Sequence, residues 1–300
     1  MSLYHTPVLL EESVGLLGIV PTGTYADLTF GGGGHSRRIL ADLGPEGRLY
    51  AFDQDRDTRA NCPEDPRFHY VESNFRFLRG ALRLRGVDGV DGILADLGVS
   101  SHHFDALERG FSFRGDAPLD MRMNQRGRLT AADVVNTFSA EELTRILGDW
   151  GELETPWKVA NCLVKARAAA PVTTTAQLVE AVKPCTPAKE SAKFLTKLFQ
   201  ALRIEVNGEM EALKMALEQS LKVLKPGGRL VVISYHSLED RLVKNFLRSG
   251  NFSGEAEKDF FGRSLAPFEL LTRKAVVPSA EELARNPRSR SAKLRAAVKR

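Results

Sequence analysis

Hydrophobic and polar positions follow two patterns in the first hundred residues. Short apolar runs typical of buried strands occupy residues 24–29, 48–52, 68–72 and 92–96, and helical spacing follows the first of them at 36–43. Parallel strands need crossover connections, which are usually helices. The alternation therefore predicts a parallel sheet with helices packed against it.

The pattern changes between about residue 105 and residue 203, where apolar residues recur at helical spacing and no strand is predicted. Ser139 and Glu142 form a capping-box pattern at the start of one of these helices. We therefore expect an all-helical inserted domain over residues 105–204. The two parts of the sheet domain would then be residues 1–104 and residues 205–300.

The sheet pattern returns after the insertion. Residues 229–234 form a β-branched run typical of a buried central strand, and residues 225–228 before them predict a turn. Ser237 is expected to begin the cap of a new helix, and residues 268–272 and 292–298 are expected to close the sheet. The predicted fold class is α/β, with a Rossmann-like sheet interrupted by helices.

Length and composition allow this organisation and exclude others. The chain has 300 residues, 43% of them hydrophobic, which can form one core domain and a smaller one. No apolar stretch approaches the roughly 20 residues of a membrane span, and the first residues do not resemble a signal peptide. Cys62, Cys162 and Cys185 are odd in number and far apart, so we expect no disulfide framework, no metal clip and a cytoplasmic location.

Charge is unevenly distributed along the chain. The net charge is only +4, yet residues 285–300 contain seven Lys or Arg and no Asp or Glu. A basic tail of this kind can contact nucleic-acid phosphates, or it can serve only as a solvated extension. Both interpretations stay open on charge alone.

Three features fall where an open parallel sheet binds its ligands, beyond the carboxyl ends of the strands. They are the glycine run at residues 31–34, Asp53 and Asp96. Glycines allow the backbone to turn sharply and approach a ligand closely. An acid at the position of Asp53 can accept both ribose hydroxyls of an adenosine-containing cofactor.

The glycine run favours one cofactor over another. A dinucleotide fingerprint has the form G-x-G-x-x-G and holds a pyrophosphate at a helix N-terminus. The run lacks the last glycine, since Gly33 is followed by Gly34, His35 and Ser36. S-adenosylmethionine has no phosphate and needs no such site, so the spacing favours it over a nicotinamide dinucleotide.

Asp96 begins a short polar motif at residues 96–101 that could face a methyl donor. A cytosine amino group is a poor nucleophile that must be aligned with the methyl group and must lose a proton. Asp96 could polarise that amine, could bind the cofactor, or could only cap the next helix.

Other polar residues are further candidates. Tyr235 and His236 follow the predicted central strand, where a base could stack on the ring and bond to the imidazole, although a polar strand end without a role is also possible. Asp120 could reach a nucleotide or form an ion pair with Arg122. His103 could line the cofactor pocket, and no metal site is expected, because the side chains of adjacent histidines diverge.

Five short motifs in a fixed order carry a family resemblance: residues 96–101, 109–113, 118–122, 199–204 and 236–241. With them, the sequence resembles the bacterial small-subunit ribosomal RNA methyltransferase H family, which makes N4-methylcytidine. The resemblance extends from residue 5 to residue 291, nearly the whole chain.

The resemblance implies a class I methyltransferase domain interrupted by a helical domain, with S-adenosylmethionine as cofactor. It implies a cytidine substrate in the decoding region of 16S rRNA within the small ribosomal subunit, and it is compatible with a homodimer. Transfer would be direct, and Asp96, Asp120, Tyr235 and His236 stay open as the proton acceptor. The implied cofactor contacts are Gly33, Gly34, His35, Asp53, Phe75, Asp96 and the position of His103, where the family often has Gln.

Two other classes of function were weighed against this one. A nicotinamide-dependent oxidoreductase is disfavoured by the spacing of the glycine run. A non-enzymatic RNA-binding or assembly factor on a methyltransferase scaffold is disfavoured because the glycine run, Asp53 and Asp96 are all intact.

Overall fold

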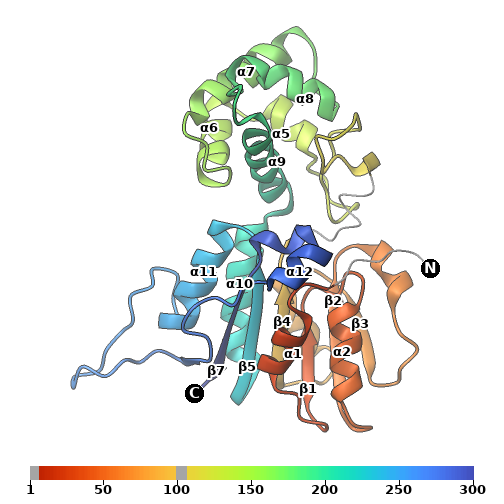
Figure 1. The fold of residues 1–300 in the computed structure, drawn as a ribbon, viewed down its shortest axis with the longest axis vertical. Coiled ribbons are helices and arrows are strands. Elements are labelled where there is room, and N and C mark those ends of the chain that lie inside the picture. The colour runs from red at the N-terminus through yellow and green to blue at the C-terminus, as the bar shows by residue number, and fades with distance from the viewer. Residues whose placement is uncertain (1–6, 99–106) are drawn as a thin grey trace. The chain divides into compact units, whose positions relative to one another are not determined.

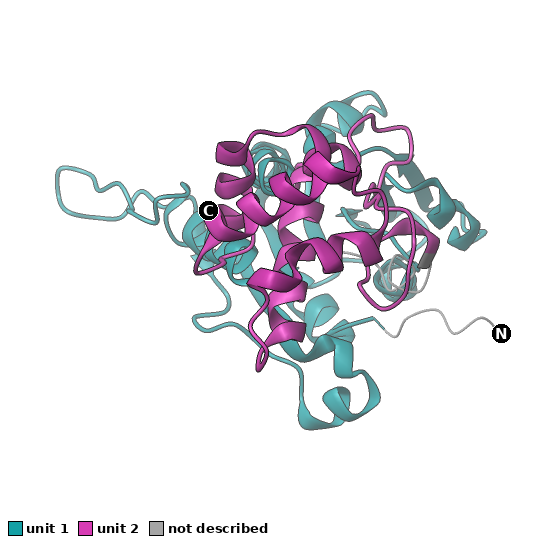
Figure 2. Ribbon diagram, turned by 90° about the horizontal axis from the view of Figure 1, so that it is seen from above, with its two compact units in different colours: residues 1–98, 210–300 teal, residues 99–209 magenta. Residues whose placement is uncertain are grey.

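The computed structural model describes residues 7–98 and 107–300, and the chain divides into two units (Figures 1 and 2). Unit 1 comprises Met1–Gly98 and Met210–Arg300, and unit 2 comprises Val99–Glu209. The helical insertion that the sequence predicts, residues 105–204, falls inside unit 2. Among the described residues, no helix is both long enough and apolar enough to cross a membrane.

Unit 1 is built on a seven-stranded sheet with the order β3-β2-β1-β4-β5-β7-β6. Strands β1 to β5 pair in parallel, whereas β7 is antiparallel to β5 and to β6. This order confirms the expected α/β, Rossmann-like fold of class I methyltransferases. The strands are β1 (Thr24–Asp27), β2 (Arg48–Asp53), β3 (Phe68–Glu72), β4 (Val90–Asp96), β5 (Leu224–Ser234), β6 (Phe268–Leu270) and β7 (Lys293–Lys299).

The helical segments of unit 1 connect these strands. They are α1 (Leu10–Leu17), α2 (Gly34–Asp42), η1 (Arg56–Asn61), η2 (Phe75–Phe77), α3 (Leu78–Arg83), α11 (Ser237–Ser249), α12 (Ala280–Arg285) and η5 (Pro287–Ser291). Helix α10 (Glu209–Val223) begins at the last residue of unit 2 and continues through unit 1 to β5.

Strand β5 shows how the sheet buries both of its faces. Val231 and Ile233 belong to one apolar cluster with α1 and α2, whereas Leu230 and Val232 line a small apolar pocket with Leu213 of α10. Successive side chains of a strand point to opposite faces, so a strand covered on both sides must be apolar at every position. This is why the sequence shows a continuous apolar run here.

The first part of β5 differs from the prediction. Val90 pairs with Leu224 and Gly92 pairs with Arg229, so residues 225–228 bulge out between two paired stretches. The sequence predicts a turn at these four residues, and the structure places them inside the bounds of the strand. A bulge of this kind keeps the pairing on both of its sides.

The basic C-terminal block is not only a solvated extension, because it contains the closing strand that the sequence predicted at residues 292–298. Its last part is β7, which lies between β5 and β6 in the sheet. Arg295 Nε lies 2.7 Å from Asp240 Oδ1, and Lys293 Nζ lies 3.4 Å from Asp240 Oδ2. Lys299 Nζ donates to the carbonyls of Leu221 and Leu224. These three cations therefore stabilise unit 1.

Unit 2 is helical, and its described residues contain no strand longer than the isolated bridge between Pro118 and Thr174. The capping box predicted for Ser139 and Glu142 is confirmed, since each side chain accepts a bond from the backbone N–H of the other residue. The helical segments are η3 (Leu107–Arg109), α5 (Ala131–Thr137), α6 (Ala140–Asp149), α7 (Pro156–Ala169), α8 (Thr175–Val182), η4 (Lys183–Cys185) and α9 (Ser191–Asn207).

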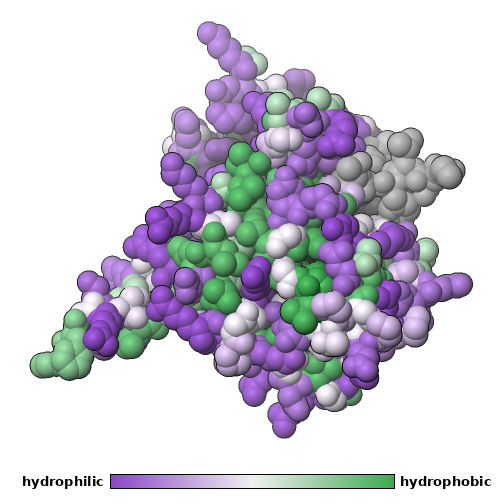
Figure 3. All heavy atoms as spheres, turned by 60° about the horizontal axis from the view of Figure 1, so that its bottom comes forward, coloured by the Kyte–Doolittle hydropathy of each residue, from purple (hydrophilic) through white to green (hydrophobic). Residues whose placement is uncertain are grey.

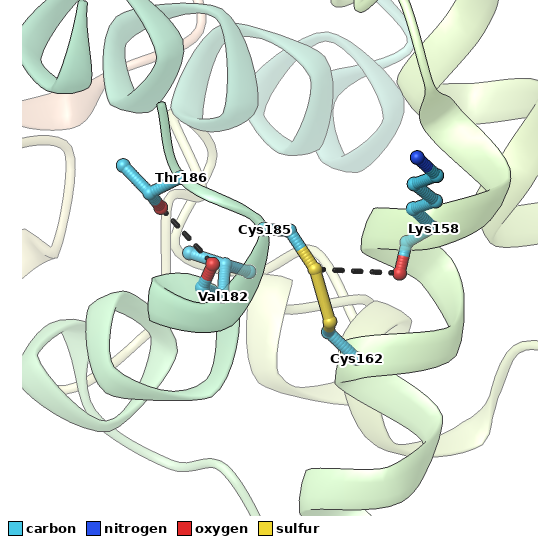
Figure 4. Close-up of a disulfide and its surroundings, with 5 residues drawn as sticks. All are labelled: Lys158, Cys162, Val182, Cys185 and Thr186. Carbon is cyan, nitrogen blue, oxygen red and sulfur yellow. Dashed lines mark hydrogen bonds between the residues drawn. A yellow bond between two sulfur atoms is a disulfide. The ribbon is translucent and has the colours of Figure 1, made fainter. Parts of the chain in front are cut away.

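A disulfide joins Cys162 of α7 to Cys185 of η4 (Figure 4). The Cys185 sulfur also lies 3.5 Å from the Lys158 carbonyl oxygen. The expectation of no disulfide is therefore wrong. The two cysteines are 23 residues apart in the sequence, and only the packing of α7 against α8 and η4 brings them together.

The long connection between α11 and β6 projects from the sheet (Figure 1, lower left) and is hydrophobic at its end (Figure 3). Its turn is closed by Asp259, whose Oδ1 accepts from the backbone N–H groups of Phe261 and Arg263. Phe260 is 97% exposed and Phe261 is 79% exposed. This aromatic pair is outside the core of unit 1.

Candidate active site

Three neighbouring strands each end on an aspartate at the same edge of the sheet. Asp27 ends β1, Asp53 ends β2 and Asp96 ends β4, and β1 lies between the other two. The carboxyl ends of parallel strands are where ligands bind in open sheets. Asp53 and Asp96 were predicted as site residues and Asp27 was not, because the predicted strand continued to residue 29 and Asp27 lay inside it.

Asp27 is fully buried and organises the start of α2. Its Oδ2 accepts a 2.7 Å hydrogen bond from the Ser36 hydroxyl, and its Oδ1 accepts a 3.1 Å bond from the Thr29 N–H. Burial raises the pKa of Asp27, and the bond from Ser36 and the charge of His35 act against that rise. Asp27 thus connects the end of β1 to the helix that follows the glycine loop.

The glycine loop needs glycine for steric reasons. Gly31 and Gly33 have φ values of +51° and +76°, in the left-handed region that side chains disfavour. A Cβ on Gly33 would lie 2.9 Å from the Phe30 ring, and a Cβ on Gly34 would lie 2.7 Å from Pro7 Cγ. The backbone of the loop is therefore bare, and its peptide groups can lie against a ligand.

Three side chains hold this loop in place. Asp53 Oδ2 accepts from the Gly31 N–H at 2.9 Å, and Asn61 Nδ2 donates to the Gly31 carbonyl at 2.9 Å. Arg37 Nη1 donates to the Gly32 carbonyl at 2.7 Å. Neither Asn61 nor Arg37 was predicted, because nothing in the spacing of the chain shows that η1 lies beside the loop or that Arg37 of α2 turns back to it.

Asp53 keeps the capacity to bind a second partner. Its Oδ1 accepts from the Asp55 N–H at 2.8 Å, so each carboxylate oxygen holds one backbone donor and retains a further acceptor position. Burial raises the pKa of Asp53 to about 6, while the two N–H bonds lower it. The carboxylate can therefore accept hydrogen bonds from ligand hydroxyls.

Asp96 connects β4 to the residue after β5. Its Oδ1 accepts a 2.7 Å hydrogen bond from the Tyr235 hydroxyl, its Oδ2 lies 3.8 Å from His35 Nδ1, and its N–H donates to Thr29 Oγ1 at 2.6 Å. Burial raises the pKa of Asp96 to about 6, against the opposing effects of His35 and the Tyr235 bond. Burial and the nearby Asp96 charge raise the pKa of Tyr235 well above its ordinary value.

His35 is buried at the start of α2. Its Nε2 lies 3.1 Å from the Val8 carbonyl oxygen, a contact in which the ring nitrogen must be the donor. The other ring nitrogen then faces Asp96. The imidazole is thus fixed between a backbone carbonyl and a carboxylate.

His236 acts as a helix cap. It is the N-cap of α11, so the predicted cap at Ser237 is one residue too late. Its Nδ1 accepts from the Glu239 N–H at 3.4 Å, and its Nε2 lies 3.2 Å from Glu239 Oε1. Glu239 also accepts from the Tyr235 N–H at 2.9 Å. The His236–Glu239 pair therefore positions Tyr235, and Tyr235 is the member of the predicted pair that reaches Asp96.

The other predicted residues have different surroundings. Asp120 lies in unit 2 and forms an ion pair with Arg122, with 2.6 Å between Oδ2 and Nη2. Burial raises the pKa of Asp120, but the bonds from Arg122 outweigh that effect and the pKa is lowered overall. Phe75 begins η2 and lines the apolar pocket with Leu28 and Leu97. The prediction for His103 lies outside the described residues.

Comparison with known proteins identifies the family to which this chain belongs. Residues 2–300 match the MraW methylase family. The chain is 59% identical over 299 residues to ribosomal RNA small subunit methyltransferase H of Parabacteroides distasonis, covering 99% of this chain and 98% of that one. The protein of the same name from Bacteroides fragilis is 57% identical over 297 residues, with 99% and 98% covered.

The chain belongs to the MraW methylase family. This methylase is an S-adenosylmethionine-dependent methyltransferase, as the resemblance implied. The finding sets aside the nicotinamide-dependent and non-enzymatic alternatives. The site at the carboxyl edge of unit 1 is therefore the candidate site for the cofactor.

Proposed function

We propose that this methylase transfers a methyl group from S-adenosylmethionine to the exocyclic N4 of a cytidine in the decoding region of 16S rRNA, within small ribosomal subunits in the cytoplasm. The names of its relatives support ribosomal RNA of the small subunit as the substrate. The observation that carries the chemistry is the 2.7 Å bond between the Tyr235 hydroxyl and Asp96, which holds a carboxylate at the edge of the sheet.

The residues at the glycine loop fit S-adenosylmethionine. The loop backbone at Gly33 and Gly34, where the missing Cβ atoms let Phe30 and Pro7 pack closely, would contact the aminoacyl part through its peptide groups. The free acceptor positions of Asp53 suit the ribose hydroxyls, and the Phe75 ring beside the apolar pocket suits the adenine. We place His35 at the inner wall of this site, through its contact with Asp96.

Bound S-adenosylmethionine supplies an electrophilic methyl group. The N4 lone pair of cytosine is delocalised into the ring, so the amine must be aligned with that methyl group and must give up one proton as the N–C bond forms. In the proposal, Asp96 accepts that proton. Its pKa of about 6 leaves most of the carboxylate ionised at neutral pH.

The side chains around Asp96 give it a fixed direction. Tyr235 holds Oδ1, so Oδ2, which lies 3.8 Å from His35 Nδ1, is the oxygen that faces the amine in the proposal, and the Tyr235 ring would stack on the base. His236 and Glu239 act on Tyr235 and are positioning residues. Asp120 and His103 stay predictions as nucleotide and cofactor contacts.

The cysteines support direct transfer in this proposal. A thiolate intermediate would need a cysteine at the edge of the sheet that carries the glycine loop. Cys162 and Cys185 form the disulfide of unit 2, and Cys62 follows η1, where burial raises the pKa of its thiol. None of the three ends a strand of the sheet.

The test uses purified methylase, unmodified small ribosomal subunits and labelled S-adenosylmethionine, followed by nuclease digestion and mass spectrometry of the rRNA. We expect N4-methylcytidine at one position, and loss of incorporation by Asp96→Asn. A methyl group on any other atom would contradict the proposal. Thermal stabilisation by S-adenosylhomocysteine, with NAD as the control ligand, checks in parallel that the cofactor site is intact.

A further inference from the structure

The segment that follows β3 in unit 1 is strongly basic. Residues 73–87 contain four arginines and no acidic residue. This stretch forms η2 and α3, and its arginines are Arg76, Arg79, Arg83 and Arg85. None of the functions assigned to the strand ends above uses them.

These arginines are available to a partner. Arg79, Arg83 and Arg85 are exposed, and none of the four forms an ion pair with another residue in the described part of the chain. Arg85 donates only to the Ala81 carbonyl, one turn earlier. By contrast, Arg295 of β7 forms an ion pair with Asp240. Arg295 belongs to the basic C-terminal block that the sequence suggested for phosphate contact.

The helix that carries the arginines is held firmly. Leu78, Ala81 and Leu82 of α3 are buried. Gln219 of α10 accepts from the Arg79 N–H at 2.9 Å and donates to the Arg76 carbonyl. Arg79 and Arg83 therefore lie on a helix that is already ordered, so the loss of conformational entropy on binding a partner is small.

The spacing places two of the guanidinium groups together. Arg79 and Arg83 are four residues apart, so they lie on one face of α3. Beside them Phe77 is 56% exposed and Leu84 is 88% exposed, and nothing lies within 4 Å of a Cβ built on Gly80. Exposed arginines next to an exposed aromatic ring are typical of surfaces that contact phosphates and stack on bases.

The positive field extends beyond the helix. Burial lowers the pKa of His69 in β3, and the charges of Arg48 and Arg85 lower it further. Positive charge disfavours protonation of an imidazole, so the charges of Arg48, the first residue of β2, and Arg85 both act at His69.

The surface starts next to the candidate active site. Phe75, the first residue of η2, lines the apolar pocket with Leu97, which directly follows Asp96. Arg79 comes only four residues after Phe75. A polynucleotide whose target base enters the site at Asp96 therefore has part of its backbone within reach of η2 and α3.

We propose that the η2–α3 surface, formed by Arg76, Phe77, Arg79, Arg83, Leu84 and Arg85, binds the ribose–phosphate backbone of the RNA substrate beside the target base. This inference rests on the proposed function only in taking the substrate to be RNA. A lipid surface fits less well, because the apolar residues Leu78, Ala81 and Leu82 of α3 are buried and the exposed apolar side chains beside it are only those of Phe77 and Leu84, which flank the helix.

The test compares wild type with the double variant Arg79→Glu/Arg83→Glu for binding to small ribosomal subunits over a range of salt concentrations. Each lost phosphate contact lowers the slope of log K against log salt by about 0.7 to 0.9. We expect the slope to fall by roughly 1.5 and affinity at low salt to fall about tenfold or more. S-adenosylmethionine affinity by calorimetry should not change.

The matched control is Lys244→Glu/Arg248→Glu on α11, which reverses two exposed charges with the same four-residue spacing in the same unit. Its slope should stay close to that of wild type, and Arg79→Lys/Arg83→Lys should keep most of the slope. If the Glu variant loses S-adenosylmethionine binding and so is misfolded, Arg79→Gln/Arg83→Gln replaces it.

Two outcomes would overturn the inference. One is a salt slope in the Arg79 and Arg83 variants equal to that of wild type. The other is an unchanged slope for RNA together with lost binding to vesicles that contain anionic phospholipid. Failure of the proposed function is a separate result, because it appears as wild-type enzyme that binds subunits but methylates an atom other than cytidine N4.

Discussion

The Tyr235 hydroxyl donates a 2.7 Å hydrogen bond to Asp96 Oδ1, and this bond joins the residue after β5 to the last residue of β4. The two strands are parallel neighbours, with Asp96 paired to Ile233, so Tyr235 lies just beyond the pairing of the sheet. The bond both fixes the direction of the carboxylate and lowers its pKa against the effect of burial. The pKa of Asp96, at the end of β4, is therefore lowered by a residue that directly follows β5.

The first prediction concerns the pH dependence of methyl transfer. Asp96, with a pKa of about 6, must be ionised to accept a proton, so kcat/KM should rise with pH and level off above about pH 7. Tyr235→Phe removes a donor that lowers this pKa, so the rising limb should move to higher pH by about one unit. The measurement is kcat/KM for small subunits between pH 5 and 9.

The result at high pH distinguishes this effect from damage to the site. At pH 8.5 to 9 the Tyr235→Phe variant should recover most of its activity, because Asp96 is then ionised in both proteins. A rising limb that stays in place would contradict the effect of the hydroxyl on the pKa of Asp96, whether or not activity falls at every pH through loss of the bond that orients the carboxylate.

The second prediction concerns the stability cost of Asp96. A carboxyl group whose pKa is raised on folding destabilises the fold only when it is ionised, so the cost is absent below about pH 4 and complete above pH 6. Asp96→Asn removes this charge and should raise the unfolding free energy by about 3 kcal/mol at pH 8 and by little at pH 4. Urea denaturation without cofactor measures the difference.

The control for that experiment is Asp88→Asn, which changes an exposed carboxyl of the same unit. Its effect should be small, because the side chain is exposed. A gain for Asp96→Asn that does not grow between pH 4 and pH 8 would show that burial of the charge is not its origin.

The third prediction concerns the cofactor. If the Asp53 carboxylate accepts the ribose hydroxyls, Asp53→Ala should weaken S-adenosylmethionine binding by about 1.5–3 kcal/mol, the usual value of hydrogen bonds to a charged group. Asp53→Asn keeps an acceptor for the Gly31 N–H, so its affinity for S-adenosylmethionine should lie between those of wild type and Asp53→Ala. Calorimetry measures these affinities, with Asp88→Ala as the control. Equal affinity in wild type, both Asp53 variants and Asp88→Ala would contradict a ribose contact by Asp53.

The fourth prediction concerns the disulfide of unit 2. Closing a loop between Cys162 and Cys185, 23 residues apart, should stabilise the folded chain by about 3 kcal/mol through the chain entropy of the unfolded state. A reductant should lower wild-type stability by that amount and leave Cys162→Ser unchanged. Cys62→Ser, in which the bond is intact, should respond like wild type; a wild type indifferent to reductant would contradict the pairing.

Part of the candidate site could be read from the sequence. Asp53 and Asp96 each end an apolar run, and the structure places both at one edge of the sheet beside the glycine loop. Asp27 ends β1, but the predicted strand continued to residue 29, and the bonds of Asp27 to Ser36 and Thr29 appear only in the fold. The pattern shows approximately where strands end, and it does not show which strand-end side chains turn inward.

His236 shows the opposite case. The motif around it drew attention to a possible nucleobase contact, and the structure uses its ring to cap α11 and to hold Glu239. A histidine is an unusual N-cap, so the propensities of short segments predicted Ser237 instead. The path of the backbone after β5 places His236, and not Ser237, at the N-cap position of α11.

Helices α1, α3 and α12 were not predicted, but the sequence by itself predicted the seven strands, the helical pattern of residues 105–203 and two of the strand-end acids. These features depend on local spacing, because burial on one or both faces imposes a period on neighbouring residues. Tertiary structure alone decided that β7 lies between β5 and β6, that Tyr235 meets Asp96 and that Cys162 meets Cys185. Such pairings join segments far apart in the chain, and they form only when the whole sheet or the whole helical unit packs.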